Sequence, residues 1–298
     1  MLTIITALFN NLELTKAFWQ SLLNDPPNVD WEIIWIDDFS TDGTREWLND
    51  LQCDKSRVIL NKKNKGFAAS NNAAAIEAKG KVLCFLNNDI ELTSGWFEPM
   101  FKILIEQAGI GIVGNTQIVP RSGLLDHAGV AFDLVGDTTH PEKGDHPKKL
   151  RGSGSFRRSV TAACWLVRKE VFRKSGGFDT VYLNGYEDVD LCLRLSKAGY
   201  KHWVSYESKI YHHVSASRKL HGATDTNLSH FLIKWGELTS QFGQQDWPRE
   251  YIKRILRHPT QINATKTLDA LLRLVHLKHG PSEWATKHRE KLIAKANL

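Results

Sequence analysis

Short apolar runs alternate with amphipathic stretches through the first 115 residues of the chain. Each run is rich in Ile, Val, Leu or Trp and has the length of a buried β-strand, whereas the stretches between them carry apolar residues at the spacing of a helix face. Strands that alternate with helices in this way predict right-handed βαβ units, and therefore an α/β fold with a mostly parallel central sheet flanked by helices. The predicted strands are 2–9, 31–36, 57–60 and 82–86, and the predicted helices are 13–23, 43–51, 68–78 and 94–106.

The alternation is less regular beyond residue 115. Residues 140–159 are polar, basic and rich in glycine, with almost nothing to bury, and we expect them to form a mobile loop. Two further strands are predicted at 162–167 and 201–206, around a helix over 188–198.

The chain beyond Trp247-Pro248 is expected to be wholly helical. One helix should end at Gly280-Pro281, and another should follow from residue 282. We therefore expect an α/β domain over residues 1–245 and a basic helical extension over residues 246–298. The first of the two helices has an apolar face, which consists of Leu268, Leu271, Leu272 and Val275.

The positive charge of the chain is concentrated in this extension. The net charge is +6, but residues 249–298 hold 11 Lys and Arg against 4 Asp and Glu, a balance of +7. Residues 1–248 hold 28 against 29, or −1, so no basic stripe runs through the body and we expect no nucleic-acid partner. The basic tail has two interpretations: it contacts an anionic membrane, or its apolar face packs on the α/β domain and its charges are solvated.

The cysteines and the first residues predict a cytoplasmic protein. The chain begins without a basic leader, and no apolar run approaches the ~20 residues that span a bilayer. The four cysteines are scattered, which disfavours a disulfide framework or a zinc site. They are Cys53, Cys84, Cys164 and Cys192. The expected location is therefore the cytoplasm. If the basic tail contacts a membrane, the protein would attach peripherally to its inner face.

Ligands of open parallel sheets bind beyond the carboxyl ends of the strands, so the residues that follow each strand should carry the chemistry. The first predicted strand is followed by Asn10 and Asn11, and the first glycine of the chain is Gly43. A dinucleotide-binding sheet would place a glycine-rich turn there, and no phosphate loop of the G-x-x-x-x-G-K-[ST] type occurs either. Both common nucleotide folds are therefore disfavoured.

Acidic and amide side chains follow two of the predicted strands. Asp37 and Asp38 end the second strand, where a carboxylate can accept a hydrogen bond from the ring N–H of a pyrimidine. Asn87, Asn88 and Asp89 follow the strand 82–86, and their oxygens suit Mg²⁺ or Mn²⁺ with a diphosphate as co-ligand. The alternative is structural: Ser40, Thr41 or Asp42 caps a helix after the first pair, and an Asx turn explains the triplet.

Three further groups are candidates. Lys65 and Gly66, where a loop enters a helix, suit an anionic ligand or simply begin the helix. Glu187 and Asp188 begin a helix, where a carboxylate can act as a general base or only complement the helix dipole. Asp190 can pair with Arg194 one turn on. In His212-His213, neighbouring side chains of extended chain point to opposite faces, so at most one can serve a given site.

Taken in order, these groups resemble the inverting family 2 glycosyltransferases, which have the GT-A fold. The resemblance covers roughly residues 1–240 and is closest to bacterial enzymes that build O-antigen, capsule and other surface polysaccharides, including rhamnosyltransferases. Each motif is weak by itself, whereas the ordered set is highly specific. The matching segments are Thr6 to Asn10, Asp37 to Gly43, Asn64 to Ala68, Leu86 to Asp89, Asp126 to Val130, Gly176 to Asp179, Glu187 to Leu191, and Ile210 with His212.

The resemblance implies a role for each of these positions. Thr6 and Asp38 would hold the base of a nucleoside-diphosphate sugar, with Lys65, Gly66 and Asn71 nearby. Asn87, Asn88 and Asp89 occupy the place of the D-x-D motif. Asp188 would be the catalytic base, Glu187 and Trp165 would contact the acceptor, and Asp89 with His212 would reach the metal.

The departure from the family pattern concerns the metal. Two of the three D-x-D positions are Asn, so Asp89 is the only carboxylate there, and we expect Mn²⁺ or Mg²⁺ to bind more weakly than in a two-Asp site. The predicted function is transfer of a UDP- or dTDP-linked sugar, with inversion, to a hydroxyl of a glycan or lipid-linked acceptor. The alternatives are a nucleotidyltransferase and a non-catalytic module that binds nucleotide sugars or glycans.

Overall fold

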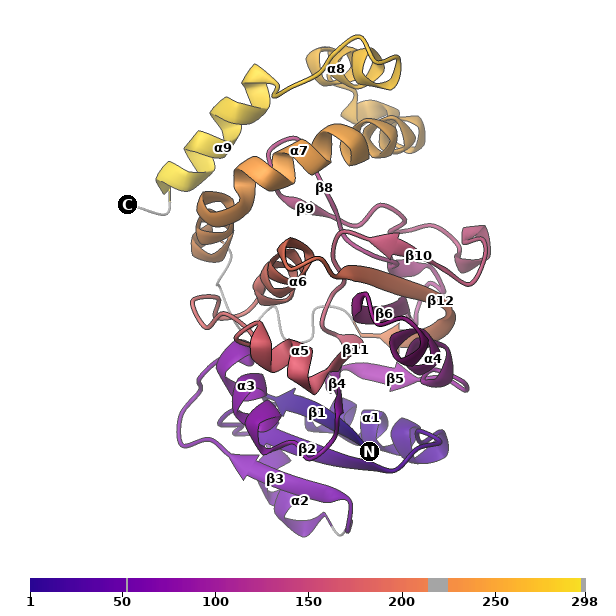
Figure 1. Ribbon diagram of the computed structural model, residues 1–298, viewed down its shortest axis with the longest axis vertical. Helices are drawn as coiled ribbons and strands as arrows, with labels where there is room; N and C mark the ends of the chain where they lie inside the picture. The colour runs from indigo at the N-terminus through magenta and orange to yellow at the C-terminus, as the bar shows by residue number, and fades with distance from the viewer. Residues whose placement is uncertain (52, 214–224, 296–298) are drawn as a thin grey trace. The chain divides into compact units, whose positions relative to one another are not determined.

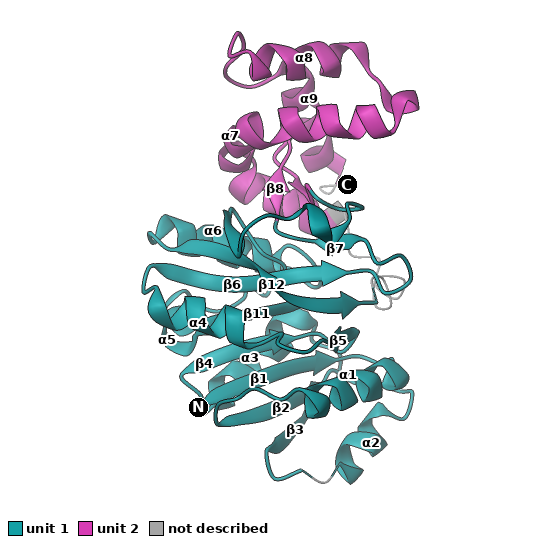
Figure 2. Cartoon of the chain, turned by 90° about the vertical axis from the view of Figure 1, so that its right-hand side faces the viewer, with its two compact units in different colours: residues 1–129, 142–222 teal, residues 130–141, 223–298 magenta. Residues whose placement is uncertain are grey.

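The computed structural model describes residues 1–51, 53–213 and 225–295. The chain forms two compact units, which Figure 2 shows in different colours. Unit 1 consists of residues 1–129 and 142–222, and unit 2 consists of residues 130–141 and 223–298.

The first half of unit 1 is the predicted series of βαβ units (Figure 1). Strand β1 pairs in parallel with β2 on one side and with β4 on the other, and β2 pairs in parallel with β3. Every strand and helix predicted before residue 90 is present, with ends that differ by at most one residue. The elements are β1 (Leu2–Leu8), α1 (Leu12–Asn24), β2 (Trp31–Asp37), α2 (Thr44–Asp50), β3 (Ser56–Leu60), α3 (Phe67–Glu77) and β4 (Val82–Leu86).

The second half of unit 1 completes a mixed sheet in the order β10-β12-β6-β11-β4-β1-β2-β3. Strand β11 runs antiparallel to both β4 and β6, whereas β12 is parallel to β6. Two short strands lie off this path: β5 pairs with β12, and β7 pairs with β6. The elements are β5 (Ile90–Leu92), α4 (Glu98–Glu106), β6 (Ile110–Ile118), β7 (Leu125–His127), η1 (Pro147–Lys149), β10 (Gly154–Arg157), β11 (Cys164–Arg168), α5 (Lys169–Lys174), α6 (Glu187–Lys197) and β12 (Lys201–His212).

Apolar side chains fill both faces of this sheet, because successive residues of a strand point to opposite sides. On one face Trp35 of β2 lies edge-on against Phe18 and Trp19 of α1, at ring-centre distances of 5.8 and 5.5 Å. On the other face Phe85 of β4 lies 5.2 Å from Phe178, in a cluster that includes residues of α3, α5 and α6. The strands are buried from both sides, which leaves their ends as the places where polar groups gather.

The expectation of a mobile loop over residues 140–159 is wrong for its last part. Residues Gly154–Arg157 form β10, the edge strand that pairs with β12, and the Phe156 ring lies 4.9 Å from that of Trp203. An added Cβ at Gly154 would meet the Val204 carbonyl oxygen at 2.3 Å, so the glycine permits the close approach of the two strands. An edge strand held by backbone hydrogen bonds needs little apolar periodicity, which is why the sequence pattern does not reveal it.

Unit 2 joins a small hairpin to three helices. Phe132 of the hairpin lies 6.4 Å from Phe231 and 6.0 Å from Phe242, both in the long helix α7. Helix α7 also contacts α8 and α9. No helix among the described residues is both long and apolar enough to cross a membrane. The elements are β8 (Ala131–Phe132), β9 (Thr138–Thr139), α7 (Asp225–Arg257), η3 (Pro259–Gln261), α8 (Ala264–Leu274) and α9 (Glu283–Lys295).

This division differs from the predicted one at residue 245. Pro248 lies inside α7 rather than at a break, so the helix continues from one side of the predicted boundary to the other. Residues 130–141 belong to unit 2 although they precede the rest of it by some 80 residues of sequence. The pairing of Phe132 with α7 is a long-range contact that local periodicity does not contain.

Candidate active site

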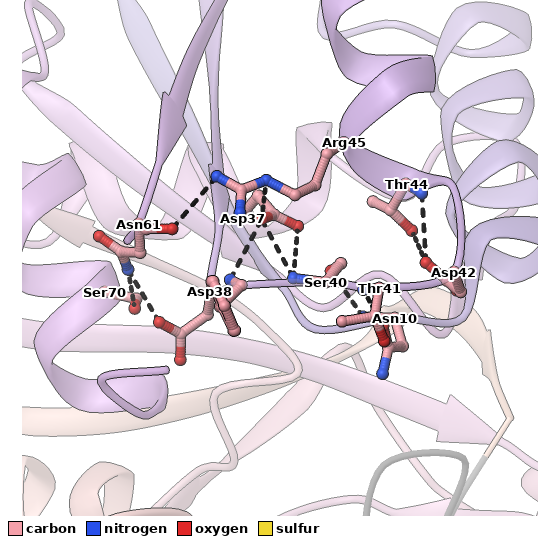
Figure 3. Close-up of polar contacts among 11 residues, drawn as sticks. Asn10, Asp37, Asp38, Ser40, Thr41, Asp42, Thr44, Arg45, Asn61 and Ser70 are labelled. Atoms are coloured by element: carbon pink, nitrogen blue, oxygen red, sulfur yellow. Dashed lines mark hydrogen bonds and ion pairs between the residues drawn. The ribbon is translucent and has the colours of Figure 1, made fainter. Parts of the chain in front are cut away.

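The loop after β2 contains the first predicted pair of carboxylates (Figure 3). Asp37 is fully buried and accepts hydrogen bonds from the backbone N–H of Phe39 and Ser40, at 3.1 and 3.2 Å. Its carboxylate also lies 3.3 Å from Arg45 Nε. Asp37 therefore fixes the turn and is used within the fold.

Asp38 points to the opposite side of the same turn, toward Asn61 (Figure 3), and it also holds the loop that carries Lys65 and Gly66. Its carboxylate accepts from Asn61 Nδ2 and from the backbone N–H groups of Lys65 and Gly66, each at 2.8 Å. A carboxylate has about four acceptor positions, so one is left for a ligand. Gly66 has φ 83°, and a Cβ there would meet the Leu183 carbonyl oxygen at 2.8 Å. The loop therefore needs glycine at this position.

The residues of the triplet after β4 have different roles: Asn88 stabilises the fold, whereas Asp89 is a candidate ligand. Asn88 donates to the Asn10 carbonyl oxygen and to Thr15 Oγ1, at 3.1 and 2.9 Å, and so connects the ends of β4 and β1. Asp89 is 5% exposed, and its Oδ1 has no hydrogen-bond partner among the described residues. The nearest group to this oxygen that can donate is His212, at a distance longer than that of an ordinary hydrogen bond.

His212 at the end of β12 faces this oxygen. Its Nε2 lies 3.5 Å from Asp89 Oδ1, and its Nδ1 lies 3.2 Å from Asp126 Oδ2. Lys143 Nζ is in turn 2.6 Å from Asp126 Oδ1. His213 turns away and pairs with Glu91 at 2.6 Å, so only one of the two histidines joins this group, as predicted.

These contacts set the protonation of the group. Burial lowers the pKa of His212, but hydrogen bonds and charges from Asp126 and Asp89 outweigh it and raise this pKa to about 9. Burial raises the pKa of Asp126, but the hydrogen bonds and charges of His212 and Lys143 outweigh it and hold this pKa well below its ordinary value. Without a metal, His212 is therefore a cation between two carboxylates.

Asp89 and His212 fit a divalent cation only as part of its ligand set. They supply one buried carboxylate oxygen and one imidazole nitrogen, which lie 3.5 Å apart. Within the described ranges no group of three His, Cys, Asp or Glu side chains has the arrangement of a complete metal site. The residues present are those expected where a substrate diphosphate and water complete the coordination.

The acidic pair at the start of α6 is the second half of the site. Tyr186, with φ 75°, turns the chain into the helix, and Asp188 in its first turn accepts a 2.9 Å hydrogen bond from the Ala162 N–H. Glu187 is buried, and its Oε2 has no hydrogen-bond partner in the part of the chain that the structure describes. Asp190 pairs with Arg194 at 2.7 Å, as predicted, and is thereby used within the fold.

Burial is the main cause of the raised pKa of both Glu187 and Asp188. It raises the pKa of Asp188, although the N–H groups of Ala162 and Val189 stabilise the charged carboxylate. Burial and the neighbouring charge of Asp188 also raise the pKa of Glu187, to about 8. Both groups therefore bind a proton more readily than exposed carboxylates do.

Hydrogen bonds connect these groups into one site. Ala162 donates to Asp188, and the carbonyl of the next residue, Ala163, accepts from the Asn87 N–H at 3.0 Å. The carboxylate of Asp188 and the triplet after β4 are thus held on adjacent residues of the segment before β11. On the other side, the Phe67 N–H donates to the Leu183 carbonyl at 3.3 Å, which joins the Lys65 loop to the segment before α6.

Three predicted site residues lie inside the protein instead. Trp165 is fully buried on β11 with its ring stacked 5.8 Å from that of Phe178, so the prediction that it contacts an acceptor is corrected: it is a core residue. Thr6 is also fully buried, with its hydroxyl enclosed, and the Asn71 side chain donates to the Phe67 carbonyl of its own helix. Both lie behind the site, and neither side chain is presented to a ligand.

The structure adds two residues without a predicted role. Asp126 on β7 orients His212 through the contact at 3.2 Å. The segment Asp126 to Val130 is part of the resemblance, but the resemblance assigns no role to Asp126. Phe39, next to Asp38, is 43% exposed and has φ 74°, a conformation that is unusual for a bulky side chain. Arg45 lies 5.7 Å from the centre of its ring. An exposed aromatic residue held in such a conformation is often part of a binding site.

The family model described as glycosyl transferase family 2 matches residues 3–176, more than half of the chain. An uncharacterized protein of Sinorhizobium fredii, y4gI, is 31% identical over 231 residues, which are 73% of this chain and 25% of that protein. The O-antigen biosynthesis protein RfbC of Myxococcus xanthus is 34% identical over 160 residues, 51% of this chain and 12% of RfbC. The chain thus spans a quarter or less of the length of these two curated relatives.

Two solved structures share the fold. The structure of GalNAc-T7 with UDP, GalNAc and Mn²⁺ has a TM-score of 0.66 and 17% identity, covering 98% of this chain and 54% of that one. The mannosyltransferase PcManGT of Pyrobaculum calidifontis, in complex with GDP-Man and Mn²⁺, has a TM-score of 0.53 and 16% identity, covering 99% and 74%. The predicted GT-A-type fold is confirmed by these neighbours.

Proposed function

The chain belongs to the family 2 glycosyltransferases, and from this premise we propose that it moves a sugar from a nucleoside diphosphate, UDP or dTDP, to a hydroxyl of a glycan or lipid-linked acceptor. The likeness to RfbC supports a role in surface-polysaccharide synthesis. One observation carries the proposal: Asp188 and the triplet Asn87 to Asp89 are held on adjacent residues, Ala162 and Ala163. This arrangement supports a proposed base of raised pKa at the same end of β4 and β11 as the proposed diphosphate site.

Asp188 is the proposed catalytic base. It removes the proton of the acceptor hydroxyl as that oxygen attacks the anomeric carbon, while the bond from this carbon to the diphosphate oxygen breaks on the opposite face. A single displacement of this kind inverts the anomeric centre. The raised pKa of Asp188 makes it a stronger proton acceptor than an ordinary carboxylate. Glu187, beside it, is the proposed contact for the acceptor.

Asp89 and His212 are the proposed protein ligands of Mn²⁺ or Mg²⁺. A bound divalent cation supplies positive charge that stabilises the departing diphosphate. Lys65, exposed on the loop that Asp38 holds, can add a further positive charge to the same group. Both solved neighbours contain Mn²⁺, which supports a metal in this fold.

The donor base is proposed to bind against the loop between β2 and α2. The remaining acceptor position of Asp38 can receive the ring N–H of a pyrimidine, with Gly66 and Asn87 lining the path toward the diphosphate. Phe39 offers an exposed ring for stacking. Thr6 and Asn71 support this surface from behind.

Two other functions are distinguishable from this one. A nucleotidyltransferase would carry a glycine-rich turn after β1, where this chain has Asn10 and Asn11. A binding module without activity would bind the donor but leave it intact, whereas a transferase slowly hydrolyses the donor when no acceptor is present. The presence of both Asp89 and Asp188 favours the enzyme.

A thermal-shift panel of UDP-, dTDP- and GDP-sugars with Mn²⁺ tests the proposal. A ligand at about 100 times its Kd stabilises the folded state by about 2.7 kcal/mol, so the correct donor should raise the Tm clearly above the others. The matched control is the panel repeated with the free sugars and no nucleotide, which should leave the Tm unchanged. If no nucleotide sugar shifts the Tm with Mn²⁺ or Mg²⁺, the proposed donor class is wrong.

A further inference from the structure

Helix α8 has its polar and apolar sides reversed relative to an ordinary surface helix. Its buried side carries Asp269 and Arg273, which are 2% and 6% exposed and form an ion pair at 2.8 Å. Asp269 also accepts from Trp284 Nε1 at 2.9 Å and from Ser282. Arg273 donates to the Gly280 carbonyl at 2.8 Å. This network fastens α8 to the start of α9 by polar contacts.

The outward side of α8 is apolar. Leu268, Leu271 and Val275 follow the spacing i, i+3 and i+7 of one helix face and are 59%, 48% and 61% exposed. Three more aliphatic residues next to the helix in sequence are also exposed: Leu256, Ile262 and Leu277. The three side chains on the helix are therefore not used in the core of unit 2. We call Leu268, Leu271 and Val275 the α8 face.

The charges in the segment that holds the α8 face are mostly positive. Residues 251–282 contain six Lys and Arg, of which Arg273 is buried, and one acidic residue, Asp269; Glu250 and Glu283 border the segment, and Glu250 pairs with Lys253. Asp269 is buried and paired, so no acidic side chain of this segment is exposed. Lys253, Arg254 and Arg257 precede η3, and Lys266 and Lys278 lie on or after α8. An exposed aliphatic surface bordered by cations is thereby present in unit 2.

We propose that the α8 face binds an anionic lipid membrane. Aliphatic side chains on one side of a helix enter the boundary between headgroups and acyl chains, and the neighbouring Lys and Arg side chains bind lipid phosphates. A nucleic acid would use the cations but gain nothing from the exposed aliphatic residues of the α8 face. A symmetric dimer through this face would bring two positively charged surfaces together. The membrane is the partner that satisfies both features, and this inference does not depend on the identity of the donor or acceptor.

Vesicle flotation tests the proposal with the full chain. The protein should float with vesicles of phosphatidylcholine and phosphatidylglycerol at low ionic strength, and much less with phosphatidylcholine alone or in high salt. Leu268→Ser/Leu271→Ser should weaken binding at least about tenfold, because two aliphatic side chains no longer enter the lipid. Lys253→Glu/Arg257→Glu should weaken it by more than about fivefold for each reversed charge.

The matched controls lie in unit 1. Ile76→Ser/Ile105→Ser removes two aliphatic side chains that are 76% and 54% exposed, and Lys102→Glu reverses an exposed cation of α4; both should float like the wild type. Circular dichroism of each variant should match the wild type, which separates lost binding from lost folding. Wild-type flotation of the folded Leu268→Ser/Leu271→Ser variant would overturn the proposal. So would a wild-type dimer that this variant dissociates, because a second copy would then cover the face.

Discussion

At the scale of single residues, carboxylates that occupy similar positions in the sequence have different roles in the structure. Asp37 fixes a turn and Asp190 pairs with Arg194, whereas the buried Asp89 faces only His212, at 3.5 Å. The sequence indicates which acids lie at the sheet edge, because they follow apolar strands. It does not indicate which of them are hydrogen-bonded within the fold. That depends on backbone N–H groups distant in sequence, such as those of Lys65 and Gly66, which donate to Asp38.

The metal ligands give the first residue-scale prediction. Asp89→Ala should abolish measurable Mn²⁺ binding in the presence of UDP. Asp126→Asn should weaken it by about 10- to 100-fold, because the orienting partner of His212 loses its charge. Binding of Mn²⁺ is measured by the loss of its free-ion electron paramagnetic resonance signal. The matched control is Glu91→Gln, which changes the partner of His213 and should bind Mn²⁺ normally. Unchanged Mn²⁺ affinity in Asp89→Ala would refute the assignment.

The acidity of Glu187 gives a prediction about pH. Its pKa is raised by burial and by Asp188 from an ordinary value near 4.5 to about 8, so the folded protein binds a proton that the unfolded chain releases. Stability conferred by this proton is present below pH 4.5 and is lost as the pH rises toward 8. Glu187→Gln, which cannot ionise, should therefore become more stable than the wild type across this range, by about 1–3 kcal/mol at the upper end.

Chemical denaturation of both proteins between pH 5 and pH 8, values that bracket most of this transition, measures the difference. Asp190→Asn is the control at the same helix start, and it should show the opposite sign because it removes the partner of Arg194. A difference between Glu187→Gln and the wild type that does not change with pH would contradict the raised pKa.

At the scale of elements, the alternation of strands and helices before residue 90 is predictable because β1, β2 and β4 are buried on both faces and helices cover the sheet. Strand β10 and the hairpin of β8 and β9 are not, since two to four residues at an edge carry no period. The residues of the candidate site are likewise predictable from the sequence only in part. Residues after regular strands are found from the pattern, whereas the link between Asp126 and His212 arises only when β7 and β12 both pair with β6.

The loop that carries Lys65 gives the element-scale prediction. Gly66→Ala should lower the free energy of unfolding by about 1–3 kcal/mol and weaken donor binding, because its Cβ would press on the Leu183 carbonyl and its φ is positive. Gly95→Ala is the matched control: φ there is also positive, at 73°, but no atom lies within 4 Å of the added Cβ. Isothermal titration with the donor should show a loss for Gly66→Ala alone. Equal donor affinities for the two variants would contradict the close approach.

At the scale of the whole molecule, the two units have separate cores, and the sequence places their boundary incorrectly because α7 continues through Pro248. Arg273→Met tests this separation. It leaves Asp269 buried with a weaker set of partners, which should destabilise unit 2 by about 3–5 kcal/mol. The donor-induced rise in the Tm of unit 1 should persist. If Arg273→Met destabilises unit 2 and also abolishes the donor-induced rise in the Tm of unit 1, the two units unfold together.

The central claim is that Asp188 takes the proton from the acceptor, and turnover of Asp188→Asn tests it most directly. Asparagine stabilises a helix start about as well as aspartate does, so a purely structural Asp188 would tolerate the change. As the base, it should lose about 10²–10⁴-fold in kcat, while donor affinity measured by titration stays within about twofold. Glu187→Gln should lose less. A folded Asp188→Asn variant with wild-type turnover would contradict the account.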